Sequence, residues 1–147
     1  MRKFLGLAAL AITVGFSANA NESENKQDVT DASQCGQIVL YNQPPSTRNL
    51  HFASINSING KAVNSNATSF SLSPGKHIIR VQEHINEEAL TRRRGEAKNY
   101  HLIEFVVEPN KKYSLAAQYN RKYRNKFKSG AYWTPTVWKT REAECQI

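Results

Sequence analysis

Three side chains that could act as metal ligands, or as an acid and a base, stand close together in the segment HINEE: His84, Glu87 and Glu88. Imidazole nitrogens and carboxylate oxygens both bind divalent metals. The spacing fits no established metal motif, however, and a solvated loop end is the favoured interpretation. His101 and Glu104 do not offer a second acid–base pair, because residues three apart on a strand point to opposite faces.

Other arrangements that support catalysis are missing from the sequence. No serine occupies a G-x-S-x-G turn, and no glycine-rich loop precedes a helix. Aspartate is absent after Asp31, and His77 and His101 lie in strand-like runs where a hydrogen-bonded histidine at the core or rim is expected. We therefore predict that the protein is not an enzyme and needs no cofactor. A hydrolase or metal-dependent enzyme using His84, Glu87 and Glu88 is the least favoured alternative.

The two cysteines, Cys35 and Cys145, form an even pair near the two ends of the region expected to fold. In an oxidising compartment such a pair predicts a disulfide. Two reactive thiols or metal ligands are the alternative, but the pair lacks the C-x-x-C spacing typical of those roles. A bridge that closes a loop of about 110 residues contributes roughly 4–5 kcal/mol in the chain-entropy model. We expect a structural crosslink.

The N-terminal residues have the three parts of a secretory signal peptide. Arg2 and Lys3 precede an apolar run from 4 to 16, and Ala18-Asn19-Ala20 provides small residues for cleavage. The apolar run is shorter than the roughly 20 residues that span a bilayer. We predict a signal peptide (1–20), a flexible polar leader (21–34) and a single domain (35–147) with no transmembrane span. The mature protein is expected to be periplasmic or secreted.

Positive charge is concentrated in the second half of the mature chain. Residues 21–89 contain five Lys and Arg against seven Asp and Glu, whereas residues 90–147 contain thirteen against five, a balance of +8. Clustered cations attract anions over a long range, and aromatic rings between them add stacking or cation–π contacts. The predicted binding patch consists of Arg92, Arg93, Arg94, Lys98, Arg121, Lys122, Tyr123, Arg124, Lys126, Lys128 and Trp133.

The partner that this patch predicts is an anionic envelope component, such as lipopolysaccharide or an anionic lipid, or else an acidic protein. Nucleic acid is not expected, because the signal peptide directs the chain out of the cytoplasm and no nucleic-acid-binding motif is present. The alternative interpretation is structural: charged residues on loops and edge strands prevent sheets from pairing edge to edge. Both interpretations remain open at this point.

Alternating apolar residues and turn signals predict the fold. Pro74-Gly75 and Pro109-Asn110 occupy the central positions of two similar turns, and Asn59-Gly60 is a strong hairpin dipeptide. Period-two alternation surrounds these turns, for example in Ile103, Phe105 and Val107, and we expect hairpins there. Pro135 predicts an edge position for the last strand, and residues 86–99 predict a polar loop with one helical turn. The chain is thus expected to form an all-β antiparallel sandwich of about seven strands.

The stretches INSINGKAV, FSLSPGKHIIRV and FVVEPNKKYSLAA, within residues 55–117, resemble small exported modules of the PEGA and carboxypeptidase-regulatory, transthyretin-like kind. In those modules a strand leads into a Pro-Gly turn that is followed by a basic residue and alternating aliphatic residues. The resemblance implies an immunoglobulin- or transthyretin-like sandwich and a non-enzymatic accessory role. It does not extend to the two cysteines or to the basic C-terminal segment.

The favoured hypothesis is therefore an exported, non-catalytic envelope module whose basic, aromatic C-terminal half contacts an anionic surface or an acidic partner. The alternative is a structural or assembly accessory protein that binds a partner strand along an exposed sheet edge. A long unpaired edge with apolar side chains would favour that alternative. The oligomeric state and the role of the leader do not follow from the sequence.

Overall fold

The computed structural model describes residues 34–41, 43–91, 95 and 97–145. The predicted signal peptide, nearly all of the predicted leader, and Arg92, Arg93 and Arg94 lie outside these residues. Nine strands form within the described chain, together with two short 3-10 turns and one α-helical turn, α1 (Glu88–Thr91). The strands are β1 (Gly36–Leu40), β2 (Leu50–His51), β3 (Ala53–Ile58), β4 (Lys61–Ala62), β5 (Ser69–Leu72), β6 (Gly75–Glu83), β7 (Tyr100–Val107), β8 (Lys111–Tyr119) and β9 (Trp133–Glu142).

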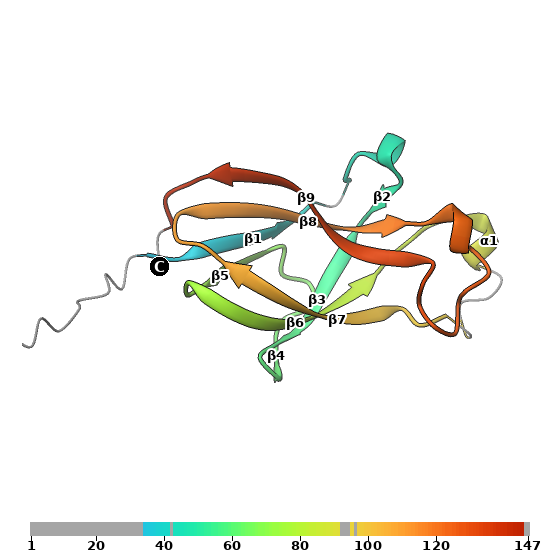
Figure 1. Ribbon diagram of the computed structural model, residues 1–147, viewed down its shortest axis with the longest axis horizontal. Coiled ribbons are helices and arrows are strands. Elements are labelled where there is room, and N and C mark those ends of the chain that lie inside the picture. The colour runs from blue at the N-terminus through green and yellow to red at the C-terminus, as the bar shows by residue number, and fades with distance from the viewer. Residues whose placement is uncertain (1–33, 42, 92–94, 96, 146–147) are drawn as a thin grey trace, which may run out of the picture.

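The strands form two sheets that pack against each other (Figure 1). In the first sheet β8 is central: it pairs with β1, β2 and β9, and β1 pairs in turn with β5. The second sheet has the order β4-β3-β6-β7. The chain changes sheets at Phe52, between β2 and β3. The predicted all-β sandwich is confirmed, with nine strands where about seven were expected because β2 and β4 are two-residue strands.

The core lies between the two sheets and is built from the inward positions of each strand. On β6 the buried residues His77, Ile79 and Val81 alternate with exposed ones, as a half-buried strand requires. The central strand β8 differs, because five consecutive residues from Tyr113 to Ala117 are buried. The largest fully buried side chains are Trp133, Tyr132, Ile38, Ile55, Ile79, Ile85, Val81, Val107 and Cys35.

One strand pair departs from the antiparallel prediction. β1 and β8 run parallel, with Ile38 opposite Tyr113 and Leu40 opposite Leu115. All other strand pairs in the described chain are antiparallel. β9 pairs only with β8, so Pro135 lies on an edge strand as predicted. The helical turn α1 lies within residues 86–99, as expected, and it is the only helical turn among the described residues of that range.

The two similar turns do not form hairpins, and that prediction was wrong. β5 pairs with β1 in the first sheet, whereas β6, which follows Pro74, belongs to the second. The turn at Pro109-Asn110 likewise carries the chain from β7 in the second sheet to β8 in the first. Turn residues set the local reversal of the chain but not the partner of each flanking strand. The Asn59-Gly60 hairpin is confirmed: Ile58 pairs with Lys61, and both turn residues have positive φ, 51° and 77°.

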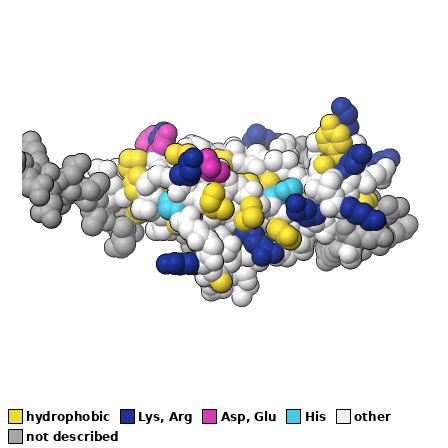
Figure 2. Space-filling model, turned by 60° about the horizontal axis from the view of Figure 1, so that its bottom comes forward, with side chains coloured by type: hydrophobic (Ala, Val, Ile, Leu, Met, Phe, Trp, Pro, Cys, Tyr) yellow, Lys and Arg dark blue, Asp and Glu magenta, His cyan; other side chains and the backbone are white. Residues whose placement is uncertain are grey.

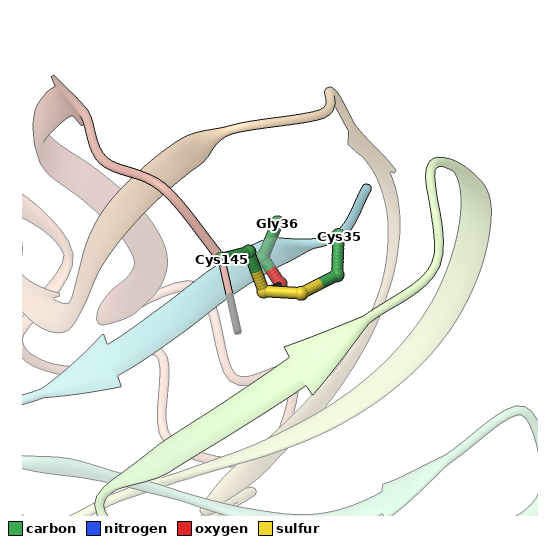
Figure 3. Close-up of a disulfide and its surroundings, with 3 residues drawn as sticks. All are labelled: Cys35, Gly36 and Cys145. Atoms are coloured by element: carbon green, nitrogen blue, oxygen red, sulfur yellow. Dashed lines mark hydrogen bonds between the residues drawn. A yellow bond between two sulfur atoms is a disulfide. The ribbon is translucent and has the colours of Figure 1, made fainter. Parts of the chain in front are cut away.

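The predicted Cys35–Cys145 disulfide is present and joins the start of β1 to the segment after β9 (Figure 3). The two Cα atoms are 5.3 Å apart, and both cysteines are buried. The backbone at Gly36 leaves no space for a side chain, because a Cβ there would lie 2.7 Å from the carbonyl oxygen of Glu108. The disulfide is consistent with an oxidising compartment. Among the described helices, none has the length and apolar character needed to cross a membrane.

Candidate cationic site

Lys98 and the cation-rich stretch from Arg121 to Lys128 meet at one end of the sandwich. The backbone N–H of Lys98 donates to the carbonyl of Phe127 at 2.8 Å. The carbonyl of Lys98 accepts hydrogen bonds from the indole N–H of Trp133 at 3.1 Å and from the hydroxyl of Tyr132 at 3.3 Å. These contacts fix the segment before β7 against the loop between β8 and β9. Residues far apart in the sequence therefore share one surface.

Six described cations form this surface, which we call the cationic end: Lys98, Arg121, Lys122, Arg124, Lys126 and Lys128. All six are exposed. Among the described residues, only Arg121 of this group lies within 4 Å of a carboxylate, Glu87, at 3.9 Å. Figure 2 shows Lys and Arg side chains gathered at the end of the molecule that carries α1 in Figure 1. The cationic end therefore presents charge that other described side chains leave largely uncompensated.

The aromatic part of the predicted patch needs correction. Trp133 is only 1% exposed, because it lies in the core and donates its indole N–H to Lys98. The neighbouring rings of Tyr119, Phe127 and Tyr132 are also buried. Tyr123 is the exception, at 40% exposed, with the ammonium of Lys122 5.7 Å from its ring centroid. We therefore remove Trp133 from the binding surface and assign it the role of anchoring Lys98.

A histidine and a glutamate form the border of the cationic end. His51 Nε2 lies 3.6 Å from Glu87, the same carboxylate that faces Arg121. Burial lowers the pKa of His51, and the charge of Glu87 opposes this shift. His51 also packs edge-on against the ring of Tyr119, with centroids 6.2 Å apart. This arrangement places one carboxylate at the border of the surface.

A polar depression of about 420 Å³ opens beside the cationic end. Arg121 and Lys122 line it together with three amide-bearing residues, Asn49, Gln118 and Asn120, and with Tyr119 and Thr134. Guanidinium, ammonium and amide N–H groups all donate hydrogen bonds, so this lining can hold the oxygens of a phosphate or carboxylate group. The volume falls within the range of small-ligand sites. Sequence spacing could not indicate this depression, because Asn49 comes from a distant turn.

The three residues of the least favoured, catalytic hypothesis do not converge to form a metal site in the described part of the chain. His84 Nε2 is hydrogen-bonded to the hydroxyl of Ser54 at 2.8 Å, whereas Glu87 faces His51 and Arg121. Glu88 begins α1 and is exposed. Within the described residues, no group of three His, Cys, Asp or Glu side chains is placed to hold a metal ion.

The two histidines expected at the core or rim are hydrogen-bonded there, as predicted. His77 donates from Nε2 to the carbonyl of Ser73 at 2.8 Å and accepts at Nδ1 from the amide of Asn59 at 2.9 Å. His101 donates to the carbonyl of Gly130 at 2.9 Å and packs edge-on against Trp133, with ring centroids 4.5 Å apart. The contacts of His101 attach β7 to Gly130 and Trp133, at the end of the loop between β8 and β9.

Comparison with known proteins identifies no relative of this chain. No family model matches the chain, no curated protein is significantly similar to it, and no solved structure matches its fold at a significant level.

Proposed function

We propose that the protein is an exported, non-catalytic module of the cell envelope whose cationic end binds an anionic surface. The observation that carries this proposal is the hydrogen bond from Lys98 to Phe127, which brings Lys98 to the segment that holds the other five described cations. The proposal includes removal of the signal peptide (1–20) and a periplasmic or secreted location. The buried disulfide supports that location, because disulfides persist in oxidising compartments.

The chemistry of the cationic end favours a phosphate-bearing surface, such as anionic lipid or lipopolysaccharide, over a single acidic protein. Four of its six cations are lysines on flexible stems, which act as point charges rather than as rigid forks for one carboxylate. Lysine and arginine near an anionic membrane each contribute about 1 kcal/mol of binding. Six such residues are enough for a selective but reversible attachment.

The test is binding of the oxidised protein to vesicles of phosphatidylglycerol and phosphatidylcholine over a salt series. We expect binding to vesicles that contain phosphatidylglycerol at low salt, and a steep loss as salt is raised, because exposed charges are screened within about 10 Å at 0.1 M. Lys126→Gln combined with Lys128→Gln removes two charges and should weaken low-salt binding roughly thirtyfold, or about 2 kcal/mol.

A matched control removes the same charge from another surface. Lys139 and Arg141 are exposed on β9, toward the disulfide and away from the cationic end. Lys139→Gln combined with Arg141→Gln should leave binding within about twofold of wild type, an allowance for long-range attraction. Equal losses in the two variants would show that net charge alone matters. Absence of wild-type binding at low salt would refute the proposal.

A second candidate function, binding of a partner strand, is favoured by β7. This strand runs for eight residues and pairs only with β6 in the described chain, so its outer edge has no strand neighbour there. An edge of this length can accept an extended segment through main-chain hydrogen bonds. Such binding would be insensitive to salt, in contrast to the vesicle binding proposed above.

A further inference from the structure

The outer face of β6 and β7 is unusually apolar for a sheet face in contact with solvent. Leu102 is 65% exposed, Val106 58% and Ile78 42%. Outward positions on a solvated strand are normally polar, but on β7 Glu104 is the only charged residue among its four exposed positions. Exposed apolar patches rimmed by polar residues mark sites of interaction. We call Ile78, Leu102 and Val106 the aliphatic stripe.

The strand register places these three side chains together and places cations beside them. Ile78 is opposite Glu104 and therefore lies diagonally next to both Leu102 and Val106, within about 7–8 Å. Arg80 is directly opposite Leu102, and Lys76 is directly opposite Val106. Lys76 forms an exposed ion pair with Glu104 at 2.9 Å.

The stripe is continuous with the cationic end through one aromatic ring. The guanidinium of Arg80 lies 4.1 Å from the ring centroid of Tyr100, and the ammonium of Lys98 lies 5.9 Å from the same centroid. Tyr100 is itself 37% exposed and begins β7. Figure 2 shows hydrophobic side chains along the middle of this face, with Lys and Arg side chains beside them and at the end of the molecule. Aliphatic, aromatic and cationic groups thus follow one another along one face.

We propose that this face lies on an anionic phospholipid bilayer, with the aliphatic stripe inserted below the headgroups and the cations at their level. The inference rests on the proposed function and names its surface. Interfacial elements combine inserted aliphatic residues with Lys and Arg that contact anionic lipids, and tyrosine is enriched at the level of the headgroups. We choose lipid because of the charge around the stripe: among its described neighbours, the cations Arg80, Lys76 and Lys98 outnumber the carboxylate of Glu104.

Vesicle binding separates the two contributions, because charge attraction is screened by salt and burial of aliphatic side chains is not. Leu102→Thr combined with Val106→Thr places β-branched residues, which favour strands, at both positions but replaces apolar surface. On phosphatidylglycerol vesicles at 0.5 M salt, we expect wild-type protein to keep part of its low-salt binding. The variant should then bind about tenfold more weakly than wild type, because less apolar surface is buried. Leu102→Ile combined with Val106→Ile should behave as wild type.

A fluorescent reporter tests insertion directly. Leu102→Trp should show a blue shift on phosphatidylglycerol vesicles and quenching by lipids brominated on their acyl chains. Ser71→Trp, at an exposed position of β5 in the other sheet, serves as the control and should show neither effect.

The outcomes distinguish the two proposals. Identical salt curves for wild type and the threonine variant, with a loss only in Lys126→Gln/Lys128→Gln, would overturn insertion and leave the proposed function standing. Absence of wild-type binding at low salt would refute both. A blue shift of the Leu102→Trp fluorescence in concentrated protein without lipid would show that a second copy of the protein packs on β7 and covers the aliphatic stripe. That result would also overturn the lipid assignment.

Discussion

The carbonyl oxygen of Lys98 accepts the indole N–H of Trp133 at 3.1 Å, and this hydrogen bond holds an exposed cation against the hydrophobic core. Trp133 is buried at the start of β9, whereas the side chain of Lys98 faces solvent. Packing of Trp133 in the core therefore fixes the position of Lys98 on the cationic end. A change that loosens the core at Trp133 should also displace this part of the surface.

Trp133→Phe removes the donor to Lys98 and part of a buried ring. We expect the free energy of unfolding to fall by about 1–3 kcal/mol, measured by urea denaturation. The control is Trp138→Phe, because the indole nitrogen of Trp138 is buried and has no hydrogen-bond partner among the described residues. Removing an unsatisfied donor offsets the lost contacts, so this variant should change stability by less than about 1 kcal/mol. Equal losses would contradict the assigned role of the Trp133 hydrogen bond.

Gly36→Ala should be strongly destabilising, because the added Cβ would meet both the side chain of Val107 and the carbonyl of Glu108. We expect a loss of about 1–3 kcal/mol from this overpacking, with the folded state distorted beside the disulfide. Gly95→Ala is the matched substitution, since a Cβ at Gly95 has no neighbour within 4 Å. Its unfolding free energy should stay the same or rise by up to about 1 kcal/mol. A mild effect at Gly36 would mean that β1 and the turn after β7 can separate easily.

Reduction of Cys35–Cys145 should lower the free energy of unfolding by roughly 4–5 kcal/mol, because the bridge closes a loop with a sequence separation of 110. Urea denaturation with and without a thiol reductant measures this difference. Cys35→Ala combined with Cys145→Ala should match the reduced protein and be unaffected by the reductant. A difference below about 1 kcal/mol would indicate that the reduced, unfolded chain keeps its ends close together.

Stability should depend on pH through His51. Burial lowers the pKa of His51 in the folded protein, so the unfolded chain, with a pKa near 6.5, takes up its proton first as the pH falls. The stability that His51 contributes is therefore fully present above pH 6.5 and is lost as the pH falls through the folded-state pKa.

The measurement for His51 is urea denaturation at pH 7.5 and pH 5.0 for wild type and His51→Gln. The wild type should lose more stability than the variant over this range, since the titrating groups distant from His51 are common to both proteins and contribute equally. Parallel pH dependences in the two proteins would contradict a lowered pKa. A larger loss in the variant would show that the attraction of Glu87 outweighs burial.

The sequence predicts local features of this fold well. Asn59 and Gly60 form the expected hairpin because their tolerance of positive φ is a property of the two residues themselves. The disulfide follows from the presence of just two cysteines, and the edge position of Pro135 follows from its missing N–H. Each of these expectations depends on one or two residues and needs no knowledge of distant contacts.

Pairing between distant strands was harder to predict. Pro74-Gly75 reverses the chain, but its two flanks enter different sheets because β5 finds its partner in β1, far back in the sequence. The aromatic residues of the basic segment show the same limit: Tyr123 is exposed while Phe127 is buried. Both lie among lysines and arginines, so local composition cannot distinguish them. The alternation of Ile103, Phe105 and Val107 implies that Leu102 and Val106 lie on the outward face with Glu104, as the structure shows, but it gives no reason for large apolar residues there.

The crosslink between Cys35 and Cys145 also determines how the protein responds to mechanical force. A pull applied to the two ends of the described chain passes through the disulfide and leaves the strand ladders between them unloaded. The cationic end lies at the opposite end of β8 and β9 and keeps its shape under such a load. Reduction would open the intervening chain to extension, releasing on the order of 370 Å of contour length.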